Sequence, residues 1–273
     1  KAEFGVFTSA NNFVSILILF TGLGTLSGVL QYGSENRAET EKKAYFKYSL
    51  LIGGAFDCLL SLGLVIAALT HLFPDDKVAY YAILLMPTIL LHFIYEYFNT
   101  ILRSEKRIKE YIVCVNINSI SSALLACVGA YFFGIYGVVL SRNLSFVLGI
   151  IPGLIYLKPE ISSIRFARRL EKTEKKELLR FSVSCCIIAA LNRALYLIDV
   201  LLIGYIIIDP EPVAVYKVGT QIPEALEFIP QSILVAIVPY FAEHNTDIDW
   251  LKKWTSKLYC FSGLLNLLIV ASL

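Results

Sequence analysis

Lysine and arginine are unevenly distributed between the long apolar stretches of this 273-residue chain, and that distribution constrains the fold more than any other feature. They gather in every second gap between apolar stretches and are scarce in the gaps between. In membrane proteins, cytoplasmic loops retain Lys and Arg, whereas translocated loops contain few of them. The pattern therefore predicts a chain that crosses a bilayer several times.

Eight apolar stretches follow one another, and most reach the roughly 20 residues that a helix needs to cross a bilayer. They cover residues 4–32, 48–73, 78–102, 111–133, 136–157, 181–208, 213–241 and 254–273. Helices are expected because backbone in lipid must satisfy its own hydrogen bonds, and the short alternating segments of a membrane barrel do not occur. Apolar and aromatic residues make up 57% of the chain, and the mean hydropathy is +0.67. We therefore predict an all-α fold, a polytopic transmembrane helical bundle with eight transmembrane helices.

The gaps also give the orientation. The basic gaps at residues 37–47, 103–109, 158–180 and 252–253 are predicted to be cytoplasmic. The opposite gaps, at residues 73–77, 134–135 and 209–212, are short and contain Lys77 as their one cation. We expect a multi-pass protein of the cell inner (plasma) membrane. The net charge of only +2 gives no support to a nucleic-acid partner.

One charged segment interrupts the series of apolar stretches. We predict an N-terminal helical lobe over residues 1–158, a cytoplasmic amphipathic linker over 159–180, and the start of a C-terminal helical lobe over 181–273. The linker is interpreted either as a solvated connection or as a surface for anionic lipid, where each Lys or Arg contributes on the order of 1 kcal/mol. The chain opens at Lys1 and stops at Leu273 inside an apolar run, so a fragment is expected.

Several short stretches carry a resemblance to a known family. They are Gly5-Val-Phe, the run from Gly22-Leu-Gly24 to Gln31-Tyr32, Tyr97 to Arg107, Leu197 to Gly204, and Val215 to Thr220 with the later Ile237-Val-Pro239. On these residues the chain resembles polysaccharide biosynthesis proteins of the O-antigen flippase type, in the multidrug/oligosaccharidyl-lipid/polysaccharide exporter superfamily. The resemblance covers essentially the whole chain and implies that its segments correspond to helices two to nine of that family.

The resemblance implies an activity. The expected cargo is an undecaprenyl-pyrophosphate-linked oligosaccharide, moved from the inner to the outer leaflet by alternating access between two lobes for surface polysaccharide synthesis. Membrane lipids and, in the same pathway, a polysaccharide polymerase and glycosyltransferases are the implied partners. A drug or cation antiporter of the same superfamily is the alternative, and it predicts that acidic residues dominate the cavity.

Polar side chains inside the spans are the candidate site residues. An ionised side chain at the bilayer centre costs roughly 2.5 to 3.5 kcal/mol on insertion scales, so such residues normally face protein or water. Residues three, four or seven apart share a helical face, which groups them into stripes that can line a central cavity. The stripes are Lys217, Gln221 and Glu224 in one span, and Asn192, Tyr196 and Asp199 in the span before it.

Chemistry assigns roles to these residues. A pyrophosphate needs cations, and Arg142, Arg193 and Lys217 are the candidates. Sugars need neutral donors, acceptors and aromatic faces. Asn192, Gln221 and Tyr196 are predicted to supply them. The remaining candidates, predicted to couple an ion or to act as counter-ions, are Asp57, Asp199 and Glu224. Internal pairs such as Arg193 with Asp199 are the alternative for the cations.

Catalysis is not expected. The outer turns are too short to present catalytic groups, and no G-x-x-x-x-G-K-[ST] loop is found. The six cysteines lack a ligand spacing, and the three histidines are isolated, so neither a metal nor another cofactor is expected. Prolines inside the spans, among them Pro87, are expected to kink their helices.

Overall fold

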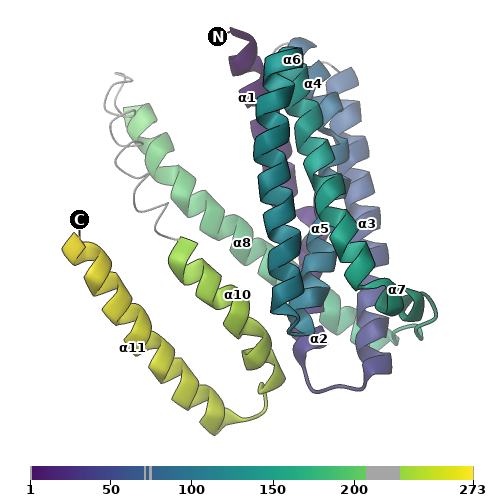
Figure 1. Cartoon of the computed structure of the whole chain (residues 1–273), viewed down its shortest axis with the longest axis vertical. Helices are drawn as coiled ribbons and strands as arrows, with labels where there is room; N and C mark the ends of the chain where they lie inside the picture. Colours follow the sequence, from purple (N-terminus) through teal and green to yellow (C-terminus); the bar gives the residue numbers. More distant parts are fainter. Residues whose placement is uncertain (1, 71, 74–75, 207–227, 273) are drawn as a thin grey trace. The chain divides into compact units, whose positions relative to one another are not determined.

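A computed structural model describes residues 2–70, 72–73, 76–206 and 228–272, which form helices joined by turns without any strand (Figure 1). The predicted all-α class is confirmed. The described residues belong to two compact units. Unit 1 is Lys1–Gly33 with Arg37–Leu191, and unit 2 is Ser34–Asn36 with Asn192–Leu273. The count of eight spans and the division into two lobes stay predictions.

Four segments of unit 1 are long and apolar enough to cross a membrane. They are Ala10–Ser34, Glu39–Leu69, Asp76–Ser104 and Ile108–Tyr156. The second is one helix, α3 (Glu39–Leu69). The first and third are each built from two helices: α1 (Ala2–Ile18) with α2 (Thr25–Ser34), and α4 (Asp76–Leu85) with α5 (Pro87–Ser104). The break before Pro87 agrees with the predicted kink, whereas the break before Thr25 was not predicted.

The fourth segment, α6 (Ile108–Tyr156), turns back on itself at Gly134. This glycine leaves the helical conformation, with φ 60° and ψ −138°. A straight helix of 49 residues would be about 73 Å long. Instead Arg107, just before the helix, donates from Nη2 to the carbonyl oxygen of Tyr156 at 3.1 Å. The predicted turn at residues 134–135 is therefore present, and α6 consists of two arms that lie side by side (Figure 1).

Three of the four basic gaps predicted to be cytoplasmic meet at one end of unit 1, namely those at residues 37–47, 103–109 and 158–180. The charged segment after α6 forms α7 (Lys158–Arg165) and the first turns of α8 (Lys172–Ile206). Lys47 at the start of α3 donates from Nζ to the carbonyl oxygens of Arg165 and Ala167, both at 2.9 Å. Segments that the charge alternation places on one side of the membrane thus contact one another.

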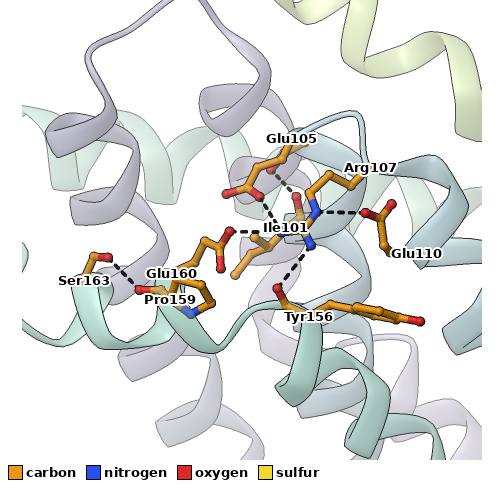
Figure 2. A network of polar contacts seen from close by, with 9 residues as sticks. Ile101, Glu105, Arg107, Glu110, Tyr156, Pro159, Glu160 and Ser163 are labelled. Atoms are coloured by element: carbon orange, nitrogen blue, oxygen red, sulfur yellow. Dashed lines mark hydrogen bonds and ion pairs between the residues drawn. The ribbon is translucent and has the colours of Figure 1, made fainter.

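Arg107 is the centre of a polar network at this end, shown in Figure 2. Its Nη1 lies 2.9 Å from Oε1 of Glu160 on α7, and its Nε lies 3.4 Å from Oε1 of Glu110 on α6. Oε2 of Glu105 lies 3.7 Å from Nη1 of Arg107. Burial and then the charge of Glu160 raise the pKa of Glu105, while Arg107 opposes the shift. One guanidinium therefore joins the end of α5, the start of α6 and α7.

Two of the three predicted outer turns, at residues 73–77 and 134–135, contribute Phe73 and Ile135 to one core cluster, whereas residues 209–212 lie outside the described residues. Phe73 packs edge-on against Phe13 of α1 with ring centroids 5.0 Å apart. Tyr81 on α4 lies 5.5 Å from Tyr136, which follows the reversal in α6. The surrounding core includes Val14, with no exposed surface. Aromatic contacts therefore close the end of unit 1 opposite Arg107.

Unit 2 contains a second helical hairpin, formed by α10 (Phe228–Glu243) and α11 (Ile248–Ser272). Asp247 lies just before α11. Its Oδ1 accepts a hydrogen bond from the main-chain N–H of Trp250 at 3.0 Å, as an N-cap side chain does. The Trp250 ring stacks on His244 at 4.1 Å between centroids. Stacking and capping together fix the turn between the two helices.

Gly137 should tolerate no larger residue, because a Cβ there would collide with the carbonyl oxygen of Gly129 in the facing arm of α6. Overpacking of this kind costs about 1–3 kcal/mol. We expect Gly137→Ala to lower the unfolding temperature of the purified protein in detergent. Gly63→Ala on α3 is the matched control, since a Cβ there meets nothing within 4 Å. Equal stability of both variants would contradict the hairpin.

Arg107→Gln should destabilise the end of unit 1 that contains Arg107 by about 1–3 kcal/mol, because three carboxylates lose their common partner. The pKa of Glu105 is raised in the folded protein, so its contribution to stability grows as pH falls and is lost as pH rises. The loss measured by thermal unfolding should therefore be smaller at pH 5.5 than at pH 8. Lys109→Gln, at an exposed position two residues later, should change little at either pH.

Candidate functional site

The break between α1 and α2 is an unwound segment inside an apolar span. Gly22, Leu23 and Gly24 all have positive φ, at 60°, 52° and 71°. Glycine adopts this conformation at little cost, but for Leu23 it is strained. Unwinding frees main-chain groups that lipid cannot satisfy, so another part of the protein must supply their partners.

Asp57 supplies one of these partners from the middle of α3. Its Oδ1 accepts a hydrogen bond from the main-chain N–H of Gly22 at 2.8 Å. The side chain has no exposed surface, and its Oδ2 has no hydrogen-bond partner among the described residues. No cationic side chain in the described part of the chain pairs with it. Asp57 is therefore a buried carboxyl group with one oxygen used and one oxygen free.

Three buried hydroxyl groups lie on the two segments that this hydrogen bond joins. Thr25 lies next to the break, and its Oγ1 is 2.7 Å from the point where a Cβ on Gly53 would stand, one helical turn before Asp57. Thr21 and Ser61 complete a set that we call the Asp57 cluster: Asp57, Thr21, Thr25 and Ser61. The hydroxyl oxygens of the three partners are buried and make no hydrogen bond in the described residues. The cluster is thus rich in unused oxygen atoms.

The second interrupted span is held by Asn143, on the second arm of α6. Thr88, in the first turn of α5, donates from Oγ1 to Oδ1 of Asn143 at 2.6 Å. Nδ2 of Asn143 donates to the carbonyl oxygen of Leu84 near the end of α4 at 3.2 Å. One amide side chain therefore bridges both sides of the break at Met86.

Arg142 precedes Asn143 and is the one predicted substrate-binding cation whose side chain is described. It is half-buried and lies within electrostatic range of His92 on α5. It forms no ion pair with a carboxylate among residues 2–70, 72–73, 76–206 and 228–272. The guanidinium is therefore available to an anion.

The other predicted site residues are distributed unevenly. Asn192 is exposed on α8. Three residues lie on α8 with side chains outside the described part: Arg193, Tyr196 and Asp199. Three more lie outside the described residues altogether: Lys217, Gln221 and Glu224. The two stripes stay predictions, and the contacts of Asp57 and of Arg142 belong to separate polar groups.

Sequence reasoning assigned no site role to the residues that complete these groups. Thr21, Thr25 and Asn143 gain their importance from the breaks that they adjoin. The available signal was the arrangement Thr21-Gly-Leu-Gly-Thr25, in which two glycines lie between two threonines. A span with that pattern can unwind, and its hydroxyls then lose the helical carbonyls to which they would otherwise bond.

Helices of this length and apolarity, interrupted by buried polar groups, define a membrane protein with several helical segments. The chain belongs to the polysaccharide biosynthesis protein family, whose family model matches residues 1–245. The resemblance found in the sequence is thereby confirmed. No curated protein and no solved structure matches the chain.

Replacing Asn143 by leucine should leave the Thr88 hydroxyl and the Leu84 carbonyl without a partner inside the span. A buried group without its partner costs about 1–3 kcal/mol. We expect Asn143→Leu to lower the unfolding temperature in detergent. Asn116→Leu, at an exposed position on the same helix, should leave it nearly unchanged. A reversed order would show that Asn143 does not support the break.

Proposed function

We propose that the protein is a transporter that moves an undecaprenyl-pyrophosphate-linked oligosaccharide from the inner to the outer leaflet of the plasma membrane. The glycan would serve the synthesis of a surface polysaccharide. Family membership supports the polysaccharide pathway, since the match extends over residues 1–245. Interrupted spans with polar linings support a path for a polar headgroup, as in transporters with broken helices.

Arg142 is the observation that carries the proposal. A half-buried guanidinium within an apolar helix is costly unless it meets an anion. Arginine offers a planar fork of donors that matches phosphate oxygens. We propose that Arg142 contacts the pyrophosphate, that the polyprenyl tail stays in lipid, and that Arg193 and Lys217 add further positive charge.

The remaining predicted residues have supporting roles in this proposal. Neutral side chains at Asn192, Tyr196 and Gln221 would contact sugar. The acidic residues Asp57, Asp199 and Glu224 would bind a coupling ion or balance the cations. Alternating access would expose the headgroup first to the cytoplasm and then to the outside.

A drug or cation antiporter of the same superfamily is the second candidate. The fully buried carboxyl group of Asp57 favours it, because a cationic drug requires acidic groups in its path. The two candidate functions predict different defects when the protein is absent. A flippase defect leaves lipid-linked repeat units on the inner leaflet, whereas an antiporter defect alters drug tolerance.

Arg142→Gln should reduce surface polysaccharide by about 10-fold to 100-fold in a deletion strain complemented with the variant, because charge-assisted bonds contribute about 1.5–3 kcal/mol. Undecaprenyl-linked repeat units should accumulate, while protein abundance stays normal. Arg142→Lys keeps the charge but loses the fork, so an intermediate effect is expected.

Arg165→Gln is the matched control, because Arg165 is exposed on α7 and its carbonyl contact with Lys47 survives the change. It should leave polysaccharide levels unchanged. A normal lipid-linked pool in the deletion strain, together with altered drug tolerance, would refute the flippase and support the antiporter.

A further inference from the structure

We propose that the Asp57 cluster is a binding site for one monovalent cation, with Na⁺ as the ion that fits it, at the unwound segment of the first span. The proposal concerns a bound ion and not the cargo, so it stands whether or not a lipid-linked glycan is the substrate. All the residues that carry it belong to unit 1.

The first step is the free oxygen of Asp57. Buried charged groups in proteins are paired or bind a metal, because an isolated charge in an apolar medium is very costly. Oδ1 accepts the hydrogen bond from the N–H of Gly22, yet Oδ2 has no partner in the part of the chain that the structure describes. The Asp57 side chain is completely buried, so bulk water does not compensate for the missing partner.

The second step is the kind of atoms around it. Thr21 and Thr25 are 7% and 0% exposed, and the Oγ1 atom of each lacks a hydrogen-bond partner in the described residues. Ser61, one turn after Asp57 on α3, has the same unused hydroxyl oxygen. Oxygen atoms from hydroxyl groups, carbonyl groups and carboxylates are the ligands of hard cations. A single small cation would satisfy several of these unused atoms at once.

The third step is charge. The cluster contains one carboxylate and otherwise neutral oxygens, so its net charge of about −1 matches a monovalent ion. No group of three or more His, Cys, Asp or Glu that could hold a metal ion occurs in the described residues. That composition disfavours zinc and similar metals, and one carboxylate is fewer than Ca²⁺ sites commonly use.

The fourth step is the backbone. α1 ends at the cluster, and the carboxyl-terminal end of a helix carries partial negative charge. Unwound segments and such helix ends coordinate Na⁺ in transporters with discontinuous helices. The ring of Phe93, which is fully buried, packs against Gly22 and Gly53 and closes the cluster on one side. The strained conformation of Leu23 is then held in place by the ion and by Asp57 together.

The test is thermal unfolding of the purified full chain in detergent, at one pH and one ionic strength, in NaCl, KCl or choline chloride. A ligand that binds the folded state stabilises it, so NaCl should raise the unfolding temperature by on the order of 5 °C above choline chloride. Binding of ²²Na⁺ to the same preparation should saturate at one ion per chain.

Two variants locate the ion. In Asp57→Asn the amide oxygen still accepts the hydrogen bond of Gly22, so the break keeps its support while the charge is lost. The increase in unfolding temperature that NaCl causes should disappear in this variant. Thr25→Val removes one oxygen at constant shape and should weaken the apparent affinity for Na⁺ at least 10-fold, whereas Thr25→Ser should keep it. If Asp57→Asn does not fold, the comparison of Thr25→Val with Thr25→Ser still tests the site.

Ser49→Ala is the matched control. Ser49 on α3 is also completely buried, and its hydroxyl has no hydrogen-bond partner in the described residues, but it lies about 12 Å along the helix before Asp57. The control should keep the full response to NaCl. Equal unfolding temperatures in the three salts would overturn the proposal. A dependence on pH without dependence on the cation would also overturn it, because a proton alone would then occupy Asp57.

A response to NaCl that persists unchanged in Asp57→Asn and Thr25→Val would place the ion elsewhere and equally refute this site. None of these measurements involves a glycan. Failure of the flippase proposal would appear in the lipid-linked pool of the deletion strain, and failure of the ion site would appear only in the purified protein.

Discussion

A main chain whose helical hydrogen bonding is interrupted inside a membrane needs partners from other helices, and unit 1 meets this requirement at two places. Asp57 supports the first break through Gly22, 35 residues away in the sequence. Asn143 supports the second through Leu84 and Thr88. In both cases the supporting side chain comes from a different span. The bends are therefore specified by tertiary contacts, and each break and its support must form together.

The helical class and the order of the loops could be predicted because they depend on local composition. Charge alternation grouped residues 37–47, 103–109 and 158–180, and contacts made by Lys47 and Arg107 now join these segments. The first span was wrongly predicted as one helix over residues 4–32. Glycine is common in membrane helices, so Gly22 and Gly24 alone do not predict a break. The partner that permits unwinding lies on α3, beyond the reach of any local pattern.

Some residues of the candidate site could likewise be predicted from the sequence, and others could not. Asp57 and Arg142 could be identified because a charged residue in an apolar run is conspicuous on its own. Thr21 and Thr25 could not, because a threonine in an intact helix bonds a carbonyl of the preceding turn. Only when the helix unwinds do such hydroxyls become free to bind something else. Spacing rules group residues along one helix, so they propose stripes such as Asn192 with Asp199 but cannot assemble a cluster from two spans.

Rigidity is unevenly distributed over unit 1, and this bears on how it could respond to a ligand. At one end of unit 1, ion pairs of Arg107 and hydrogen bonds from Lys47 to main-chain carbonyls hold neighbouring segments together. The break beside Asp57 relies on one hydrogen bond from α3 and contains the strained Leu23. Local opening begins where few interactions resist it. Apolar packing alone requires neither the carboxyl group of Asp57 at one break nor Arg142 near the other, because ionisable side chains inside a span are costly. Each of the two breaks therefore lies near an ionisable side chain.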